Sequence, residues 1–172
     1  MTDSEIAPGW RIDEGARARS IAEHDIESVR DDPALIRITA FAAALCDVPT
    51  ALVSIVEERR QTFLARNGLD QSETPRETSF CQFAMIGNDI MVVPDATADT
   101  RFADNPLVTG EPGIRFYAGA PIVASDGTPL GSLCVIDTCP REGLTPLQRQ
   151  GLLVLAADVM QRLDRNRQFR AA

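Results

Sequence analysis

The sequence predicts an α+β fold, with a central antiparallel sheet between two long helices on one side and crossover segments on the other. Two pairs of β-rich segments are joined by tight turns, which is typical of antiparallel hairpins. A long segment with an apolar stripe at helical spacing precedes the first hairpin, and another follows the last. The 172 residues, of which 44% are hydrophobic, suit one domain with a sizeable core.

Residues 1–31 are polar and acidic, and we expect them to form a loosely attached arm or one or two short helices. A stronger helix is predicted over residues 33–46. Asp32 can cap its free N–H groups, and Pro33 fits its first position. Its apolar stripe consists of Leu35, Ile38, Ala42 and Leu45, with Phe41 beside it.

The next part of the chain predicts the first hairpin and a short helix. Residues 50–56 are rich in β-branched side chains, and residues 61–66 return after a charged turn, so the two form an antiparallel pair. Residues 67–78 are expected as a loop. A short helix is expected over residues 79–86, and a short strand over residues 90–93.

Residues 94–106 form a long polar connection that contains too many turn-forming residues for regular structure. A connection of this length inside a compact domain is usually functional or a lid. The clearest strands follow, over residues 115–124 and 130–137. Between them, Asp126 and Gly127 give the strongest short-range signal for a hairpin turn.

The second long helix is predicted over residues 145–167, where a Thr-Pro-Leu-Gln capping box marks its start. Either its whole apolar stripe covers the sheet, or part of it pairs with a second subunit together with the helix over residues 33–46. The chain therefore divides into the arm, a domain over residues 32–168 and a tail over residues 169–172.

The charge and residue inventory excludes several classes of function. The net charge is −8 and all 17 basic residues are arginine, so neither nucleic acid nor an anionic membrane is an expected partner. Without lysine there is no Schiff-base chemistry. The sequence has neither a membrane-spanning run nor a signal peptide pattern, and we expect a cytoplasmic protein. With His24 as the single histidine and no Cys-x-x-Cys spacing, no metal site is expected.

Four stretches are distinctive when they are taken together in this order. They are residues 74–81 (TPRETSFC), 92–106 (VVPDATADTRFADNP), 115–121 (RFYAGAP) and 131–137 (GSLCVID). On these stretches the chain resembles the GAF domain, in the form found in bacterial sensor histidine kinases and diguanylate cyclases. The resemblance covers about residues 33–165.

This resemblance implies a sheet of five or six strands with the terminal helices on one face, where members of the family commonly dimerise. It implies a small-molecule pocket on the other face, under the crossover helix and loops. Family members bind cyclic nucleotides, bilins, haem or small metabolites, and others serve only as dimerising connectors. The expected function is therefore a non-catalytic sensory module for an unidentified small molecule, with a ligand-free dimerisation module as the alternative.

The expected partners are a second copy of the chain and an output protein such as a histidine kinase or a cyclase. No output domain is expected within these residues. The chain is then a standalone sensor module, a partner-binding protein or a piece of a longer protein. The sequence names no cofactor.

The candidate ligand-binding residues lie in and around the segments expected to form the pocket. They comprise aromatic rings that can stack, arginines that can hold a carboxylate or phosphate, an amide and two thiols. They are Phe63, Cys81, Phe83, Arg101, Phe102, Asn105, Arg115, Tyr117 and Cys134.

Each candidate also has a structural alternative. The aromatic residues are also typical of a core, and Asn105 can cap a turn. Arg101 is expected to pair with Asp95, Asp99 or Asp104 and so brace the long connection. Arg115 is the stronger candidate for an anion.

Specific chemistries of GAF relatives are weakly supported. The resemblance would place the nucleophile of a free methionine sulfoxide reductase within residues 111–117, which contain no cysteine, although Cys81 falls near a resolving position. Cys46 and Cys134 lie in apolar runs and resemble core residues. No Cys-His dipeptide suits a bilin, and His24 lies outside the matched region, so haem has no axial ligand there. Cyclic nucleotide binding stays open.

Overall fold

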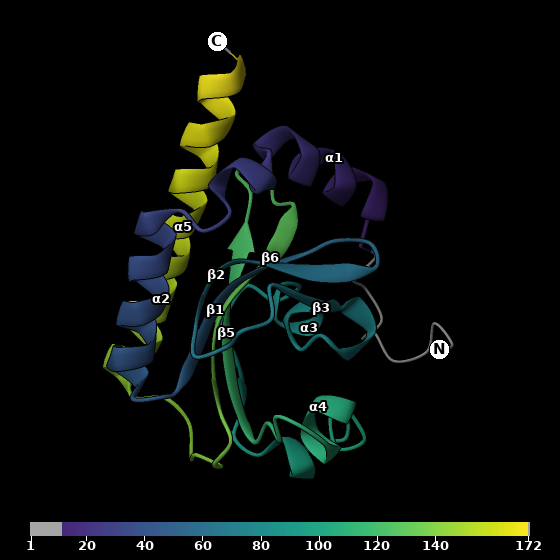
Figure 1. Cartoon of the computed structure of the whole chain (residues 1–172), viewed down its shortest axis with the longest axis vertical. Coiled ribbons are helices and arrows are strands. Elements are labelled where there is room, and N and C mark those ends of the chain that lie inside the picture. Colours follow the sequence, from purple (N-terminus) through teal and green to yellow (C-terminus); the bar gives the residue numbers. More distant parts are fainter. Residues whose placement is uncertain (1–11, 172) are drawn as a thin grey trace.

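The computed structural model describes residues 12–171 and confirms the α+β architecture (Figure 1). One antiparallel sheet contains six strands in the order β3-β2-β1-β6-β5-β4. The strands are β1 (Thr50–Val56), β2 (Arg60–Asn67), β3 (Glu73–Pro75), β4 (Met91–Val93), β5 (Phe116–Val123) and β6 (Pro129–Asp137). The helices are α1 (Glu14–His24), α2 (Pro33–Cys46), α3 (Cys81–Ala84), α4 (Pro106–Thr109) and α5 (Pro146–Ala171), with 3-10 turns η1 (Ile26–Val29), η2 (Arg76–Thr78) and η3 (Ala96–Ala98).

Side chains along the two central strands alternate between two hydrophobic cores, as the pleat of a sheet requires. On β1, Val53 and Ile55 belong to one core and Leu52 to the other. On β6, Leu133 and Cys134 divide in the same way. The sheet therefore has a different buried environment on each face.

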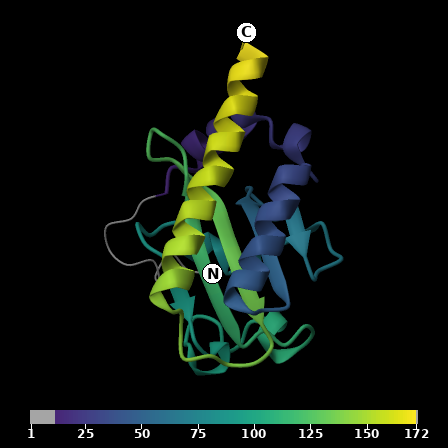
Figure 2. The same cartoon turned by 90° about the vertical axis from the view of Figure 1, so that its left-hand side faces the viewer.

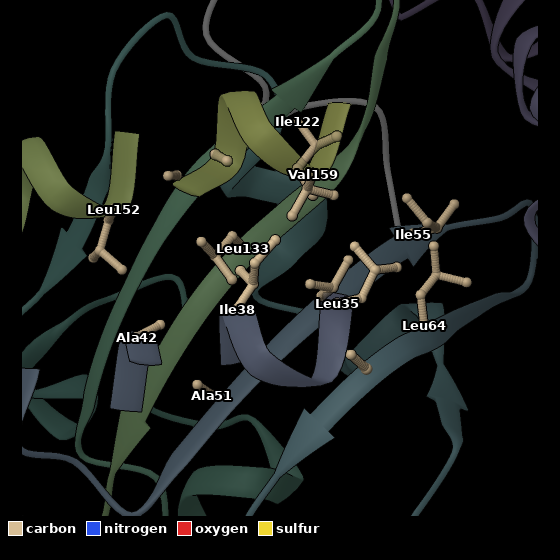
Figure 3. Packing of buried hydrophobic residues seen from close by; sticks show 14 of the residues in the cluster. Leu35, Ile38, Ala42, Ala51, Ile55, Leu64, Ile122, Leu133, Leu152 and Val159 are labelled. Atoms are coloured by element: carbon tan, nitrogen blue, oxygen red, sulfur yellow. The ribbon is translucent and has the colours of Figure 1, made fainter. Parts of the chain in front are cut away.

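The first core lies between the sheet and a layer made by α2 and α5, which run side by side (Figure 2). Figure 3 shows Leu35 and Ile38 of α2 and Val159 of α5 close to Leu133 in the sheet. This confirms that the two long terminal helices cover one face. Phe41, expected beside the stripe of α2, has 58% of its surface exposed.

The second core fills the opposite face, under α3, α4, η3 and their connecting loops (Figure 1). Phe102, from the long connection, is fully buried there. Its ring stacks on Phe80 at a centroid distance of 4.0 Å and meets the edge of Phe83 at 5.3 Å. The polar connection over residues 94–106 is therefore held to the sheet by an aromatic anchor.

Residues 67–78, expected as a loop, contain the edge strand β3 and the turn η2. Thr62 pairs with Glu73 across β2 and β3, and the Gln61 side chain donates a hydrogen bond to Thr74 Oγ1 at 2.7 Å. Pro75 is tolerated because an edge strand has one side without a strand partner. β3 depends on β2 for its pairing, which explains why its own three residues gave no strand signal.

A loosely attached arm or one or two short helices were expected here, and the described part of the arm contains the helices α1 and η1. Arg17 is buried, and its guanidinium donates to the carbonyl oxygens of Pro129, at 2.6 Å, and of Val56. The ring of His24 lies between the Ser20 carbonyl, at 2.6 Å, and the Asp164 carboxylate, at 3.1 Å. These contacts join α1 to the sheet and to α5. The expected arm and tail also include residues 1–11 and 172, which lie outside the described residues.

Helix α5 continues through Ala171, beyond the end expected at residue 167, because its last turns contain neither glycine nor proline. Residues 169–171, expected as part of a tail, are thus helical. Among residues 12–171, no helix combines the length and the apolar character that crossing a bilayer requires.

Candidate functional site

A cavity of about 140 Å³ lies on the face of the sheet opposite α2 and α5. We call it the sheet cavity. Strands β1, β2, β5 and β6 form its floor, and α3, α4 and the loops around them form its cover. Its apolar lining includes Leu52, Phe63, Leu69, Phe80, Leu107, Ile114 and Ile136.

Some residues that line the sheet cavity are exposed to solvent and others are buried. Gly68 and Pro112 are exposed and mark its outer end. Cys81, Tyr117 and Cys134 are at most 3% exposed and mark its inner end. A small molecule that enters between the loops would therefore reach two thiols and a phenol.

A compact hydrogen-bonded cluster forms the inner end. The Tyr117 hydroxyl donates to Cys81 Sγ at 3.2 Å, and it lies 3.0 Å from the Ser132 hydroxyl. The Cys134 Sγ lies 3.8 Å from Cys81 Sγ. Alternation along β5 and β6 directs Tyr117, Ser132 and Cys134 to the same face, where the first residue of α3 meets them.

The cluster shifts the pKa values of the two thiols in opposite directions. Hydrogen bonds from Cys134, Tyr117 and Ser132 lower the pKa of Cys81 to about 7, against the effect of burial. The hydrogen bond to Cys81 and burial raise the pKa of Cys134. Burial also raises the pKa of Tyr117, which therefore stays protonated and remains a donor.

A second polar group, centred on Gln61, closes one wall of the sheet cavity. Its side-chain oxygen accepts hydrogen bonds from Ser54, at 3.0 Å, and Ser79, at 2.7 Å. Its side-chain nitrogen donates to Thr74. Because these groups bind one another, a ligand would meet a mainly apolar surface here.

Four of the nine residues predicted to bind a ligand line the sheet cavity: Phe63, Cys81, Tyr117 and Cys134. Phe102 and Phe83 lie behind the lining, in the aromatic anchor described above. Both are packing residues in this structure, which is the alternative considered for them.

The remaining three candidates hold the loops in place. Arg101 forms an ion pair with Asp99 at 2.8 Å, which confirms the bracing contact expected for it. Arg115 donates to the carbonyl oxygens of Val108 and Ile114, at 2.9 and 3.0 Å. Asn105 caps α4 and donates to a backbone carbonyl of η2. None of the three lines the sheet cavity, and a ligand contact for them stays a prediction.

Several lining residues were missed because they carry no polar chemistry. Leu52 pairs directly with Cys134 across β1 and β6, so the strand alternation that points to Cys134 also points to Leu52. Leu107 and Ile114 enclose the other side, where no periodic pattern in the sequence identifies them. Among the described residues that line the sheet cavity, Asp137 is the only acidic or basic one, so these residues offer no cation to an anionic ligand.

No group of three or more His, Cys, Asp or Glu side chains suited to a metal ion occurs within residues 12–171. His24 binds α5 rather than the sheet cavity, and it offers no axial ligand to a haem placed there.

A six-stranded antiparallel sheet, with helices on one face and a loop-covered cavity on the other, is the architecture of a small sensory domain. The model of the GAF domain family matches residues 32–163, and the chain belongs to this family. GAF domains are sensory and signalling modules, and they generally occur in sensor proteins together with partner domains.

A protein of Pseudomonas aeruginosa named a cyclic di-GMP phosphodiesterase is 46% identical over 134 residues, which are 78% of this chain and 23% of that protein. The chain thus spans about a quarter of that relative's length. The GAF domain of a Coxiella burnetii phosphoenolpyruvate-protein phosphotransferase superposes with a TM-score of 0.66, at 13% identity, over 93% of this chain and 99% of that one. A free methionine-R-sulfoxide reductase from Thermoplasma acidophilum superposes with a TM-score of 0.57, at 17% identity, over 80% and 93%. Both of these structures share the fold of this chain.

Proposed function

We propose that this chain is a non-catalytic sensory module that binds a small, mainly apolar molecule in the sheet cavity, between residues 79–113 and the central sheet. The observation that carries the proposal is the lining. Apolar side chains from the sheet, such as Leu52 and Phe63, face apolar side chains from the cover, such as Leu107 and Ile114. Small-molecule sites are typically concave and apolar with a few placed polar groups.

The volume limits the size of the ligand. A dry apolar cavity of about 150 Å³ accommodates a benzene molecule, and the sheet cavity is about 140 Å³. Drug-sized ligands generally occupy roughly 300–1,000 Å³. We therefore expect a molecule of about one ring, whereas a bilin, a haem or a cyclic nucleotide would require the cover to move.

The proposed output is a separate signalling domain or protein. The relative from Pseudomonas aeruginosa is named a cyclic di-GMP phosphodiesterase, and the matched region is only 23% of it. We propose a comparable arrangement, in which ligand binding here controls a nucleotide cyclase, a phosphodiesterase or a histidine kinase. The long helix α5 contacts the sheet along β5 and is the element best placed to carry the change.

The experiment that tests binding is a thermal-shift screen of one-ring compounds. A ligand at about one hundred times its Kd should add about 2.7 kcal/mol to the free energy of unfolding. Leu107→Trp places a larger side chain in the cover of the sheet cavity and should abolish the shift. Leu147→Trp, at an exposed position of α5, is the matched control and should preserve it. The absence of any shift, or an equal shift in Leu107→Trp, would contradict the proposal.

Dimerisation without a ligand is the second candidate, and exposed apolar side chains favour it. Ile36 and Phe41 on α2, and Val154 on α5, are 41%, 58% and 59% exposed. Sedimentation velocity at micromolar concentration should then show a dimer. Phe41→Glu should give a monomer, while Glu111→Gln, in the loop before β5, should leave the dimer intact. A monomeric wild-type chain would exclude this candidate.

A reductase acting on methionine sulfoxide is the less favoured third candidate. The shared fold with such an enzyme and the thiols of the sheet cavity favour it, but residues 111–117 contain no cysteine to attack the sulfoxide. An assay of free methionine sulfoxide turnover tests the reductase candidate. Turnover that disappears in Cys81→Ser would support the enzyme, and its absence in the wild type would exclude it.

A further inference from the structure

The inner end of the sheet cavity contains two thiols in near contact. Cys81 Sγ and Cys134 Sγ are 3.8 Å apart, although 53 residues separate the cysteines in sequence. A disulfide bond is about 2.05 Å long, so the two sulfur atoms must move closer by less than about 2 Å to form one. We propose that Cys81 and Cys134 are an oxidisable dithiol, which a hydroperoxide entering the sheet cavity converts into a reversible disulfide.

The surroundings distinguish the two sulfur atoms chemically. Tyr117 and Ser132 direct hydroxyl groups to Cys81 Sγ, at 3.2 and 3.6 Å. Cys134 Sγ lies 3.8 Å from Cys81 Sγ, and the hydrogen bond between the two thiols lowers the pKa of Cys81. These donors favour the thiolate of Cys81, while Cys134 stays protonated. A thiolate beside a protonated thiol is the arrangement that peroxide oxidation followed by resolution requires.

Access is consistent with a small oxidant. Both cysteines are nearly inaccessible to bulk solvent, yet both line the sheet cavity, whose outer end is marked by exposed residues. A hydrogen peroxide molecule has two heavy atoms and fits a space that accommodates a benzene ring. A protein thiol or a bulky alkylating reagent is too large for the same path. The site therefore favours peroxides over larger thiol reagents.

The reaction balances without any further cofactor. The Cys81 thiolate attacks one oxygen of the hydroperoxide, the O–O bond breaks, and Cys81 becomes a sulfenic acid while the leaving alkoxide or hydroxide takes up a proton. Cys134 then attacks the Cys81 sulfur, the S–O bond breaks, and the proton of Cys134 leaves with the hydroxide as water. Two thiols are oxidised by two electrons and one hydroperoxide is reduced. A small dithiol reverses the change by thiol–disulfide exchange.

The other two cysteines serve as internal controls. Cys46 is the last residue of α2 and is buried in the core between that helix and the sheet, and burial raises its pKa to about 11, so it is a poor nucleophile. Cys139 is exposed, and its backbone N–H donates a hydrogen bond to the Asp137 carboxylate. Cys139→Ser therefore removes a competing surface thiol and leaves the fold unchanged.

The test is to treat the reduced Cys139→Ser chain with hydrogen peroxide, block the remaining thiols under denaturing conditions and map the peptides. Trypsin cleaves after arginine, so Cys81 lies in residues 77–101 and Cys134 in residues 116–141. In the wild type the second peptide also contains Cys139, and the substitution makes the assignment unambiguous. We expect these two peptides to be cross-linked, with the loss of two hydrogen atoms, and to separate after treatment with a dithiol.

A second variant isolates the first step, the oxidation of Cys81 to a sulfenic acid. Cys134→Ala removes the resolving thiol, so Cys81 should accumulate as a sulfenic acid that a 1,3-diketone reagent labels. Cys46→Ala in the Cys139→Ser background keeps both Cys81 and Cys134 and should still form the cross-link. Peroxide treatment that leaves three free thiols in Cys139→Ser, or that links Cys46 or two chains instead, would overturn the proposal. No added ligand is involved, so the outcome is separate from that of the binding screen.

Discussion

The guanidinium of Arg162 binds both carboxylate oxygens of Asp32, at 3.0 and 2.9 Å, and so joins α5 to the first turn of α2. The same carboxylate accepts the backbone N–H of Ala34 at 2.8 Å and caps α2. One side chain therefore both starts a helix and holds that helix against its neighbour. The two roles can be separated by substitution.

Asp32→Ala removes both roles and should lower the free energy of unfolding by about 1–2 kcal/mol, chiefly through the cap. Asp32→Asn keeps a good capping side chain and loses only the ion pair. Because Arg162 is 40% exposed and solvent screens the pair, the cost of Asp32→Asn should be less than about 1 kcal/mol. Urea unfolding of both variants measures the difference. Equal costs would show that the cap contributes nothing.

Acid should remove the difference between the wild type and Asp32→Asn. Burial opposes ionisation of Asp32, but hydrogen bonds from Arg162 and Ala34 outweigh it and lower its pKa. A lowered pKa means that the contribution is complete above the ordinary carboxyl pKa, about 3.9, and is lost as pH falls through the lower folded value. The two unfolding curves should therefore differ at neutral pH and converge only below about pH 4. A difference that persists in strong acid would contradict this assignment.

Phe102→Ala should be among the most destabilising single substitutions. The ring is fully buried between Phe80 and Phe83 and anchors the long connection. Phenylalanine-to-alanine changes in a core cost about 3–5 kcal/mol. Phe169→Ala, at a position 85% exposed on α5, is the control and should change the free energy of unfolding by less than about 0.5 kcal/mol. Comparable losses in the two variants would refute the anchor.

Arg17→Lys should loosen α1. A lysine ammonium cannot reproduce the fork with which Arg17 reaches Pro129 and Val56, so one buried carbonyl loses its donor. We expect a cost of about 1–3 kcal/mol, with faster hydrogen exchange of the α1 amides than of the central strands. Arg19→Lys, at an exposed position of the same helix, should leave the exchange unchanged. Unchanged α1 exchange in Arg17→Lys would mean that other contacts hold this helix.

Tyr117→Phe should raise the pKa of Cys81, because it removes a hydroxyl that donates to the thiolate. The rate of peroxide oxidation at pH 7 should fall up to about tenfold for each unit of increase. At alkaline pH, where Cys81 is ionised in both proteins, the two rates should converge. A slower rate at every pH would instead indicate that the ring controls access.

Local signals predicted most of the fold. Asp126 and Gly127 are sufficient for a hairpin, since Gly127 adopts the left-handed φ of +89° that the turn requires. The starts of both long helices also carry their own capping residues. The edge strand β3 and the attachment of α1 depend on distant partners, which include the Val56 and Pro129 carbonyls. No local pattern reports such partners.

The candidate site was only partly predictable for the same reason. Tyr117 and Cys134 lie on strands, where alternation assigns each side chain to a face. Arg115 was a candidate only because a guanidinium group can bind an anion. In the structure it donates to backbone carbonyl oxygens, which every residue carries and which no sequence pattern marks. The short distance between Cys81 and Cys134 depends on how α3 packs against the sheet, and no local sequence pattern indicates that packing.

The alternation along β6 also determines how far a signal must travel. Cys134 faces the sheet cavity, while its neighbours Leu133 and Val135 face the layer of α2 and α5 from the reverse side of the same strand. The proposed dithiol and the layer of α2 and α5 are therefore on opposite faces of one strand. A displacement of Cys134 would shift the backbone of β6, and with it the side chains of Leu133 and Val135 that pack in the core beneath the helices.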